Sequence, residues 1–278
     1  MTEPVSAFVG RSWSTWTEPE VIEVDGVPTA YRREGDGPTT VFLHAEVGTR
    51  GWFPLHQELA KSVDLIAPEH PGFGDTPLGA GFDEWTDWVL HYEGFFRALG
   101  LGRVHLIGDS VGAWIAANLA AYYPDRFGSV SLIAPLGLRL REVESVDAFR
   151  LDDAEKDHIY FNGRQERYAD LLSQENELED AIQALGESTA LALLTWNPRY
   201  DRKLDTRLQR VIAPTLVLGV EEDRFASNRM AERYAELIPD ARLTVVEGAD
   251  GESSSHRVAL EQPADVADVI ARHIIEHD

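Results

Sequence analysis

The sequence predicts an α/β protein in which a mostly parallel, twisted sheet carries helices on both faces and an inserted helical cap. Short apolar runs alternate with longer segments of helical spacing, which is typical of βαβ units. The predicted strands are residues 40–43, 63–68, 104–107, 130–135, 213–219 and 242–246, and the predicted helices are residues 52–61, 83–99, 113–123, 227–238 and 261–273. Because the apolar runs are continuous, they indicate parallel strands that are buried on both faces.

A charged segment, residues 137–208, interrupts this alternation. It shows helical spacing over residues 153–160, 164–173 and 177–194 and contains no convincing parallel strand. We therefore predict two units, which are a core of residues 1–136 and 209–278 and a helical cap (lid) of residues 137–208. A cap above the carboxyl ends of the strands would exclude water and shape the binding pocket.

The first part of the chain adds antiparallel structure. Residues 21–24 and 29–33 are β-prone, and Asp25-Gly26 between them is a strong hairpin signal. Residues 1–19 have no clear period and are predicted to form an arm that lies on the body.

The amino-acid composition excludes some kinds of chemistry and disfavours some kinds of binding partner. The 278 residues include no cysteine, which excludes disulfides and thiolate chemistry, and 44% of them are hydrophobic. The net charge of -23 disfavours binding to nucleic acid or to an anionic membrane. No apolar run reaches about 18 residues, and the start lacks the features of a signal peptide. We expect a cytoplasmic protein that binds a small-molecule substrate, no nucleic acid and no membrane, and we leave a homodimer open.

A short motif follows the predicted strand at residues 104–107. It reads Gly108-Asp109-Ser110-Val111-Gly112, and a good helix former without Gly or Pro comes directly after it. A G-x-S-x-G motif between a strand and a helix predicts a nucleophile elbow, because small residues let the two backbones approach closely. Such a turn exposes the serine hydroxyl and directs the positive end of the helix toward a developing oxyanion.

A serine nucleophile requires partners elsewhere in the chain. A neutral imidazole must accept its proton, and a buried carboxylate must orient that imidazole. Backbone N–H groups must then stabilise the oxyanion.

With these features the chain resembles the α/β-hydrolase fold superfamily, in its capped, esterase-like form, over about residues 20–275. Besides the elbow, the resemblance rests on Leu43-His44, Pro71-Gly72-Phe73-Gly74, the strand leading to Asp223, and His256 before Glu261-Gln262-Pro263. It implies a sheet of about eight strands and a catalytic triad in the order Ser, acid, His.

The triad that the resemblance implies is Ser110, Asp223 and His256. Glu221 and Glu222 compete with Asp223, which matches the usual place of the acid most closely. The family usually ends its last strand with Gly-x-Gly-His, whereas here about four extra residues precede His256. The alternative is a solvated His256 and an incomplete triad.

The resemblance also assigns the oxyanion hole to backbone N–H groups of Val111 and of either Ala45 or Glu46. His44 would brace that loop, and Ala45 stands where the family often has glycine. The candidate pocket residues are His44, Trp52, Trp114 and four aromatic residues of the cap, each of which could equally belong to the core of the cap: Tyr160, Phe161, Trp196 and Tyr200.

The sequence therefore predicts a serine hydrolase that cleaves a carboxylic ester or lactone of a small, largely apolar substrate through an acyl-enzyme on Ser110. Carbon–carbon bond hydrolysis of a diketone-type substrate stays open, because it can use the same triad. A non-hydrolytic ligand-binding or biosynthetic member of the fold is the alternative from another class. No cofactor and no metal are expected, since no phosphate loop, dinucleotide fingerprint or metal-ligand cluster is present.

Overall fold

The computed structural model describes residues 15–47, 49–143, 146–172 and 177–278. Most of the predicted N-terminal arm lies outside these residues. Trp16, which is inside them, forms an isolated antiparallel bridge with Gly51. No helix in the described part of the chain is long and apolar enough to cross a membrane.

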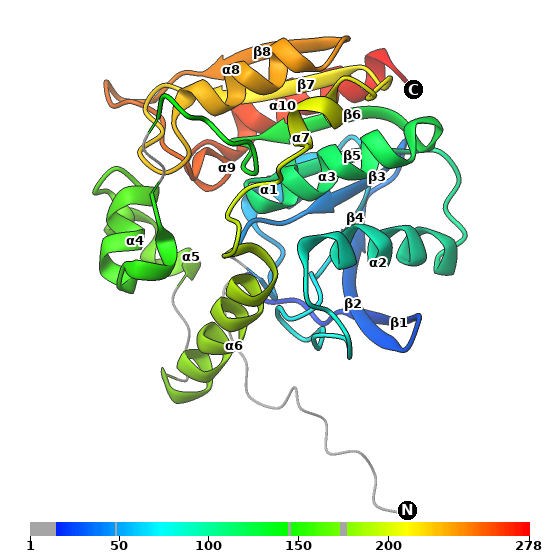
Figure 1. The fold of residues 1–278 in the computed structure, drawn as a ribbon, viewed down its shortest axis with the longest axis horizontal. Helices are drawn as coiled ribbons and strands as arrows, with labels where there is room; N and C mark the ends of the chain where they lie inside the picture. The colour runs from blue at the N-terminus through cyan, green and yellow to red at the C-terminus, as the bar shows by residue number, and fades with distance from the viewer. Residues whose placement is uncertain (1–14, 48, 144–145, 173–176) are drawn as a thin grey trace, which may run out of the picture.

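A single eight-stranded sheet forms the centre of the described chain, as predicted (Figure 1). In spatial order its strands are β1 (Glu20–Val24), β2 (Val27–Glu34), β4 (Asp64–Pro68), β3 (Thr39–Leu43), β5 (Val104–Asp109), β6 (Phe127–Ile133), β7 (Thr215–Val220) and β8 (Ala241–Val246). The predicted hairpin β1–β2 is antiparallel, and so is the β2–β4 pair. All other neighbours are parallel, so the carboxyl ends of β3, β5, β6 and β7 share one edge.

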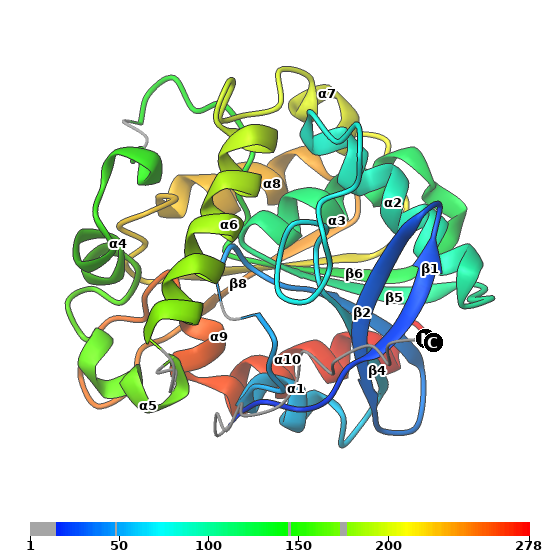
Figure 2. The same cartoon turned by 90° about the horizontal axis from the view of Figure 1, so that it is seen from below.

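Helices cover both faces of the sheet, because adjacent strand residues point to opposite sides. In β5, Leu106 packs in one apolar cluster and Ile107 in the other, and both are buried. Figure 2 shows the two layers, with α1 and α10 on one face and α2, α3 and α8 on the other. These helices are α1 (Pro54–Leu59), α2 (Trp85–Ala98), α3 (Val111–Tyr122), α8 (Asn228–Leu237) and α10 (Pro263–Glu276).

The helix predicted at residues 261–273 is divided in the structure. A short helix, α9 (Val258–Glu261), ends before Gln262, and α10 begins at Pro263. Gln262 has φ -137 and ψ 60, a non-helical conformation. The break follows from sterics, because a proline ring disfavours the helical conformation in the residue before it.

The segment of residues 137–208, here called the insertion, is helical in its described part. Its elements are η2 (Ala148–Arg150), α4 (Asp153–Tyr160), η3 (Gln165–Tyr168), α5 (Ala169–Leu172), α6 (Glu177–Thr195) and α7 (Leu204–Leu208). Over its described part, the helix predicted at residues 164–173 is instead a 3₁₀ turn followed by one turn of α-helix. Figure 1 shows α4, α5 and α6 beside the edge of the sheet. α7 buries Leu204 and Leu208 completely in the main apolar cluster, to which α6 also contributes Ala190 and Leu194.

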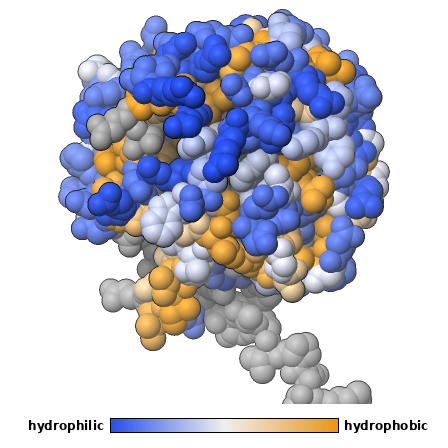
Figure 3. All heavy atoms as spheres, in the orientation of Figure 1, coloured by the Kyte–Doolittle hydropathy of each residue, from blue (hydrophilic) through white to orange (hydrophobic). Residues whose placement is uncertain are grey.

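One face of α6 is apolar and exposed. Leu178, Ile182 and Leu185 stand at helical spacing and retain 71%, 62% and 68% of their accessible surface. They belong to the orange patch that Figure 3 shows over α6.

Candidate active site

Ser110 occupies the sharp turn between β5 and α3. Its backbone angles are φ 52 and ψ -111, which residues other than glycine rarely adopt. A Cβ at Gly108 would lie 2.4 Å from the carbonyl oxygen of Gly112, and a Cβ at Gly112 would lie 2.2 Å from that of Leu43. Both positions therefore require glycine. The backbone N–H of Ser110 donates to Ile133 O at 2.9 Å, which ties the turn to β6.

The structure brings the three predicted triad residues into one hydrogen-bonded line. His256 Nε2 lies 2.8 Å from Ser110 Oγ, and His256 Nδ1 lies 2.8 Å from Asp223 Oδ2. Ser110 and His256 are fully buried. Because Asp223 also accepts backbone N–H bonds, it is an acceptor, so Nδ1 carries the proton and Nε2 can accept from the serine hydroxyl.

Electrostatics support these protonation states. Burial raises the pKa of Asp223, but His256 and the backbone donors Ala226 and Phe225 outweigh burial and hold it below its usual value. Burial lowers the pKa of His256, but Asp223 and Glu46 outweigh that effect and hold it above its usual value. The carboxylate therefore stabilises the imidazolium, as a general base requires.

In the loop after β7, the three acidic residues Glu221, Glu222 and Asp223 point in different directions. Asp223 Oδ1 accepts from the backbone N–H groups of Phe225 at 2.9 Å and Ala226 at 2.7 Å, which points its other oxygen at His256. Glu222 is about half exposed and pairs with Arg224. Glu221 points to the loop after β8. Of the three, Asp223 alone contacts the histidine.

The atypical loop before His256 is anchored from two sides. Glu221 Oε2 accepts from the N–H of Gly248 at 2.6 Å and of Ser254 at 3.3 Å. Ser254 Oγ in turn donates to Val246 O at 2.5 Å. From the insertion, Arg164 donates to Ser253 O at 3.0 Å. These bonds direct the loop inward and leave His256 inside the site.

The loop after β3 is braced by two buried histidines. His44 Nε2 accepts from the backbone N–H of His70 at 2.9 Å, so His44 Nδ1 carries the proton and donates to Ala45 O at 2.5 Å. His70 Nε2 donates to His44 O at 2.8 Å. Burial lowers the pKa of His44 to about 4, so it stays neutral in this role. The bracing orients the segment from which the second oxyanion donor, Ala45 or Glu46, is expected.

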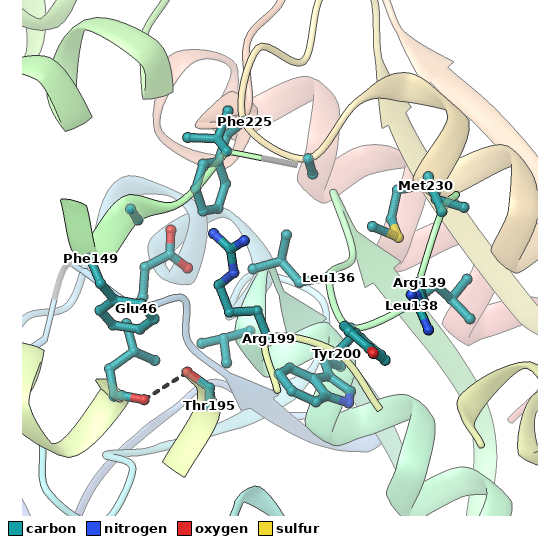
Figure 4. A pocket seen from close by; sticks show the side chains of 18 of the residues that line it. Glu46, Leu136, Leu138, Arg139, Phe149, Thr195, Arg199, Tyr200, Phe225 and Met230 are labelled. Atoms are coloured by element: carbon teal, nitrogen blue, oxygen red, sulfur yellow. Dashed lines mark hydrogen bonds between the residues drawn. The ribbon is translucent and has the colours of Figure 1, made fainter. Parts of the chain in front are cut away.

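Two cavities lie near the triad, and their linings include residues beside it but none of Ser110, Asp223 and His256. The first, called the nucleophile cavity, has a volume of about 260 Å³ and reaches Val111, while the second has a volume of about 490 Å³. Figure 4 shows the nucleophile cavity, with Glu46 and Phe149 on one side of the view and Leu138 and Met230 on the other. Its lining is mainly apolar.

The predicted pocket residues divide into two groups. Trp114, Tyr160 and Tyr200 line the nucleophile cavity, and Tyr160 and Trp196 line the second cavity. The structure places the other three elsewhere, since His44, Trp52 and Phe161 line neither cavity. Trp52 and Phe161 are buried in apolar clusters instead, because a large aromatic side chain is buried in the core as readily as in the wall of a pocket.

Comparison with known proteins identifies the family. A model described as the alpha/beta hydrolase family matches residues 40–269. The chain belongs to this family. The resemblance seen in the sequence and the predicted fold class are thereby confirmed.

Three relatives illustrate the range of this hydrolase's family. A 2-hydroxy-6-oxo-6-phenylhexa-2,4-dienoate hydrolase of Comamonas testosteroni is 28% identical over 236 residues, which are 77% of this chain and 82% of that protein. A monoacylglycerol lipase of Xenopus laevis is 23% identical over 264 residues, covering 84% and 74% of the two chains. Among solved structures, a meta-cleavage product hydrolase of Pseudomonas fluorescens IP01 has a TM-score of 0.76 and 21% identity, covering 93% of this chain and 98% of its own.

Several residues of this hydrolase's site were not anticipated from the sequence. The Phe225 ring packs against His256 at 4.9 Å between centroids, on the same imidazole on which the predicted pocket residue Tyr160 stacks at 5.7 Å. Arg257, directly after the histidine, is buried and lies 3.9 Å from Asp109. The apolar residue two positions after the acid was the one signal in the sequence for Phe225. For Arg257 there was none.

One group of described residues has the spacing of a metal site. The potential ligand atoms of His273, Glu276 and His277 all lie within 4.8 Å of one another, at the end of α10. His273 Nε2 faces Pro214 O at 3.2 Å, and His277 Nδ1 faces His273 O at 2.7 Å. Backbone carbonyls therefore already occupy one nitrogen of each imidazole.

Proposed function

We propose that this α/β hydrolase cleaves a carboxylic ester or lactone of a small, largely apolar substrate through an acyl-enzyme on Ser110. The observation that carries the proposal is the line from Ser110 through His256 to Asp223, with two hydrogen bonds of 2.8 Å. In this assignment the three residues are nucleophile, general base and orienting acid.

The chemistry follows from the protonation states. Ser110 Oγ attacks the carbonyl carbon while His256 Nε2 takes its proton, and the negative charge moves to the carbonyl oxygen. Val111 N–H at the start of α3 is the first oxyanion donor in this proposal. When the tetrahedral intermediate collapses, the alkoxide leaves and takes the proton from Nε2. Water then repeats the sequence on the acyl-enzyme, and His256 again serves first as base and then as acid.

The nucleophile cavity supports a small, largely apolar acyl group. It holds about 260 Å³ and includes Leu136, Leu138 and Met230 in its lining. Burial of apolar surface there would stabilise the bound substrate by about 25 cal/mol for each Å² removed from water. The inserted segment of residues 137–208 contributes Phe149 and Leu191 to this lining, which supports its proposed role as a cap.

Carbon–carbon bond hydrolysis is the second candidate, and one observation favours it. The name of the Comamonas relative describes an oxo-dienoate substrate, which is a carboxylate, and Arg139 and Arg199 line the nucleophile cavity here. Both guanidinium groups have partners, however. Arg199 pairs with Asp147 at 2.9 Å, and Arg139 stacks on Tyr200 at 5.0 Å. The Arg199 guanidinium is already paired with a carboxylate, so we place ester cleavage first.

Two measurements test the proposal. A fluorophosphonate probe should label Ser110 stoichiometrically, and folded protein that refuses the probe would point to a non-hydrolytic binder. A panel of p-nitrophenyl esters and lactones, set against a 2-hydroxy-6-oxo-dienoate, should then give the higher kcat/KM on an ester or lactone. A preference for the dienoate would replace ester cleavage with the carbon–carbon reaction.

A further inference from the structure

Glu46 places a carboxylate inside the site that the triad chemistry does not use. Its Oε1 lies 4.0 Å from His256 Nε2, and its side chain is 4% exposed. Neither of its two oxygens makes a hydrogen bond of normal length and angle within the described chain, although the hydroxyl groups of Ser110 and Tyr160 lie close enough to interact with the carboxylate. Glu46 also lines both cavities, so it stands where the nucleophile cavity meets the second one.

A carboxylate that is buried without donors is costly, and folding retains it only where something compensates its charge. Burial raises the pKa of Glu46, but His256, once it is protonated, Arg257 and the Ser110 hydroxyl outweigh burial and hold this pKa below its usual value. The carboxylate is therefore ionised. Its hydrogen-bonding capacity is nevertheless only partly used, so a ligand that brings a charged donor to this point gains a strong interaction.

Other charged side chains in the cavity linings already have partners, so they are less able to bind a charged group of a ligand. Arg199 pairs with Asp147, and Arg139 lies over Tyr200. Glu187, which lines the second cavity, already accepts from Gly74 N–H at 2.9 Å. Glu46 thus combines burial, charge and acceptor capacity that is only partly used.

Its position relative to the proposed chemistry defines which part of the substrate it would contact. His256 Nε2 is the atom that gives the leaving group its proton, so the leaving oxygen comes within about 3 Å of it. A carboxylate oxygen 4.0 Å from the same nitrogen borders that leaving group. A donor placed two carbons from the leaving oxygen can reach it with an N–H···O distance of about 2.8 Å.

We propose that Glu46 is a specificity residue that selects esters of amino alcohols, in which a protonated amine stands two carbons from the leaving oxygen. This inference rests on the proposed ester hydrolysis and names its substrate class. The ammonium group donates to Glu46 and pairs with its charge, while the acyl group occupies the nucleophile cavity. The protein's net charge of -23 also draws a cationic substrate toward the site. By the same interaction, Glu46 disfavours substrates that carry a carboxylate near the scissile bond.

An isosteric pair of substrates tests the inference. 2-(Dimethylamino)ethyl butyrate and 3-methylbutyl butyrate have the same shape, but only the first carries a protonated nitrogen. We expect the native protein to hydrolyse the cationic ester with a kcat/KM at least about tenfold higher, since a charge-assisted hydrogen bond has this effect or more. In Glu46→Gln the ratio of the two kcat/KM values should fall toward one. Glu222→Gln, which removes an exposed carboxylate from a neighbouring loop, is the matched control and should keep the native ratio.

A second measurement needs no variant. In the native protein, free 2-(dimethylamino)ethanol should inhibit more strongly than 3-methylbutan-1-ol, and the difference should vanish above the pKa of the amine. A ratio near one in the native protein, or an unchanged ratio in Glu46→Gln, overturns the inference. If the cationic ester is not hydrolysed although a fluorophosphonate labels Ser110, the inference alone fails. If Ser110 is not labelled, the proposed function fails with it.

Discussion

Ser110 and His256 share one hydrogen bond, yet the chain holds them in place by different means. The backbone conformation positions the serine. At Gly108 and Gly112 other backbone atoms come so close that the chain can make this turn only with glycine. Side chains position the histidine, with Glu221 and Ser254 fastening its loop and Asp223 orienting its ring. The backbone turn is a local property of five consecutive residues, whereas the side-chain network joins segments that are far apart in the sequence. The position of the serine therefore depends on a few consecutive residues, above all the two glycines, whereas the position of the histidine depends on side chains from distant segments.

Removal of the nucleophile gives the largest expected effect. Ser110→Ala should lower kcat on p-nitrophenyl butyrate by about 10⁵-fold or more, because no acyl-enzyme can form. Ser131→Ala is the matched control, since Ser131 is equally buried, in β6, and its hydroxyl has no partner among the described residues. Nearly full activity of Ser110→Ala in a folded protein would contradict the mechanism.

The orienting acid comes next. Asp223→Asn should lower kcat by about 10⁴-fold, because an amide can hold the imidazole in the wrong tautomer and does not stabilise the imidazolium. The same assay measures it, with Glu222→Gln as control. A large loss in the control and none in Asp223→Asn would move the acid to Glu222.

Loss of a side chain that anchors the loop before His256 should have a smaller effect on kcat. This change tests most directly whether side chains hold the histidine in place. Glu221→Ala removes the acceptor of two backbone N–H groups, so kcat should fall by about tenfold and amide exchange at Gly248 and Ser254 should accelerate. Glu247→Ala, at an exposed neighbouring position, should change neither quantity. Labelling of Ser110 by a fluorophosphonate should be slower, but complete. If Glu221→Ala is indistinguishable from its control, the loop is held by other contacts.

The pH profile gives the smallest expected change. Activity should fall at low pH as His256 takes up a proton, and this limb should lie above the usual histidine pKa of about 6.5. Glu46→Gln removes a nearby negative charge, so the imidazolium is less stable, the pKa of His256 falls, and the limb moves to lower pH. The profile is measured as kcat/KM for a neutral ester. Burial raises the pKa of Asp109 to about 6, so Asp109 titrates in the same pH range as His256. The variant Asp109→Asn removes this second titration from the profile. A limb that moves to higher pH contradicts this account.

The difference between Ser110, which is held by local backbone geometry, and His256, which is held by distant side chains, also explains which features could be predicted from the sequence. The elbow, the hairpin and the order of strands depend on local spacing, and they could be inferred without any contact information. His256 could be inferred from its distance to Pro263, despite an unusual loop. The bond from Arg164 to Ser253 spans 89 positions along the chain, and no local pattern indicates it.

The pocket was predicted less well for a related reason. Residue type shows that an aromatic side chain is buried, but not whether it faces a cavity or the core. Trp114 and Tyr160 line the nucleophile cavity, whereas Trp52 and Phe161 are buried in apolar clusters and line neither cavity. The sequence also could not show that the carboxylate of Glu46 has acceptor capacity left, because this depends on which donor groups the fold places near it.

The arginine that joins the insertion to the histidine loop has one more consequence. Arg164, directly before η3, donates to Ser253 O and to Glu261, and Arg167 within η3 donates to Glu252, so η3 is bonded to the loop before His256. Any displacement of η3 must carry that loop with it or break those bonds. The free energy of moving the insertion is thus coupled to the free energy of aligning the base, and such coupling is reciprocal. A ligand that binds more tightly to one arrangement of η3 therefore also shifts the balance between aligned and misaligned imidazole.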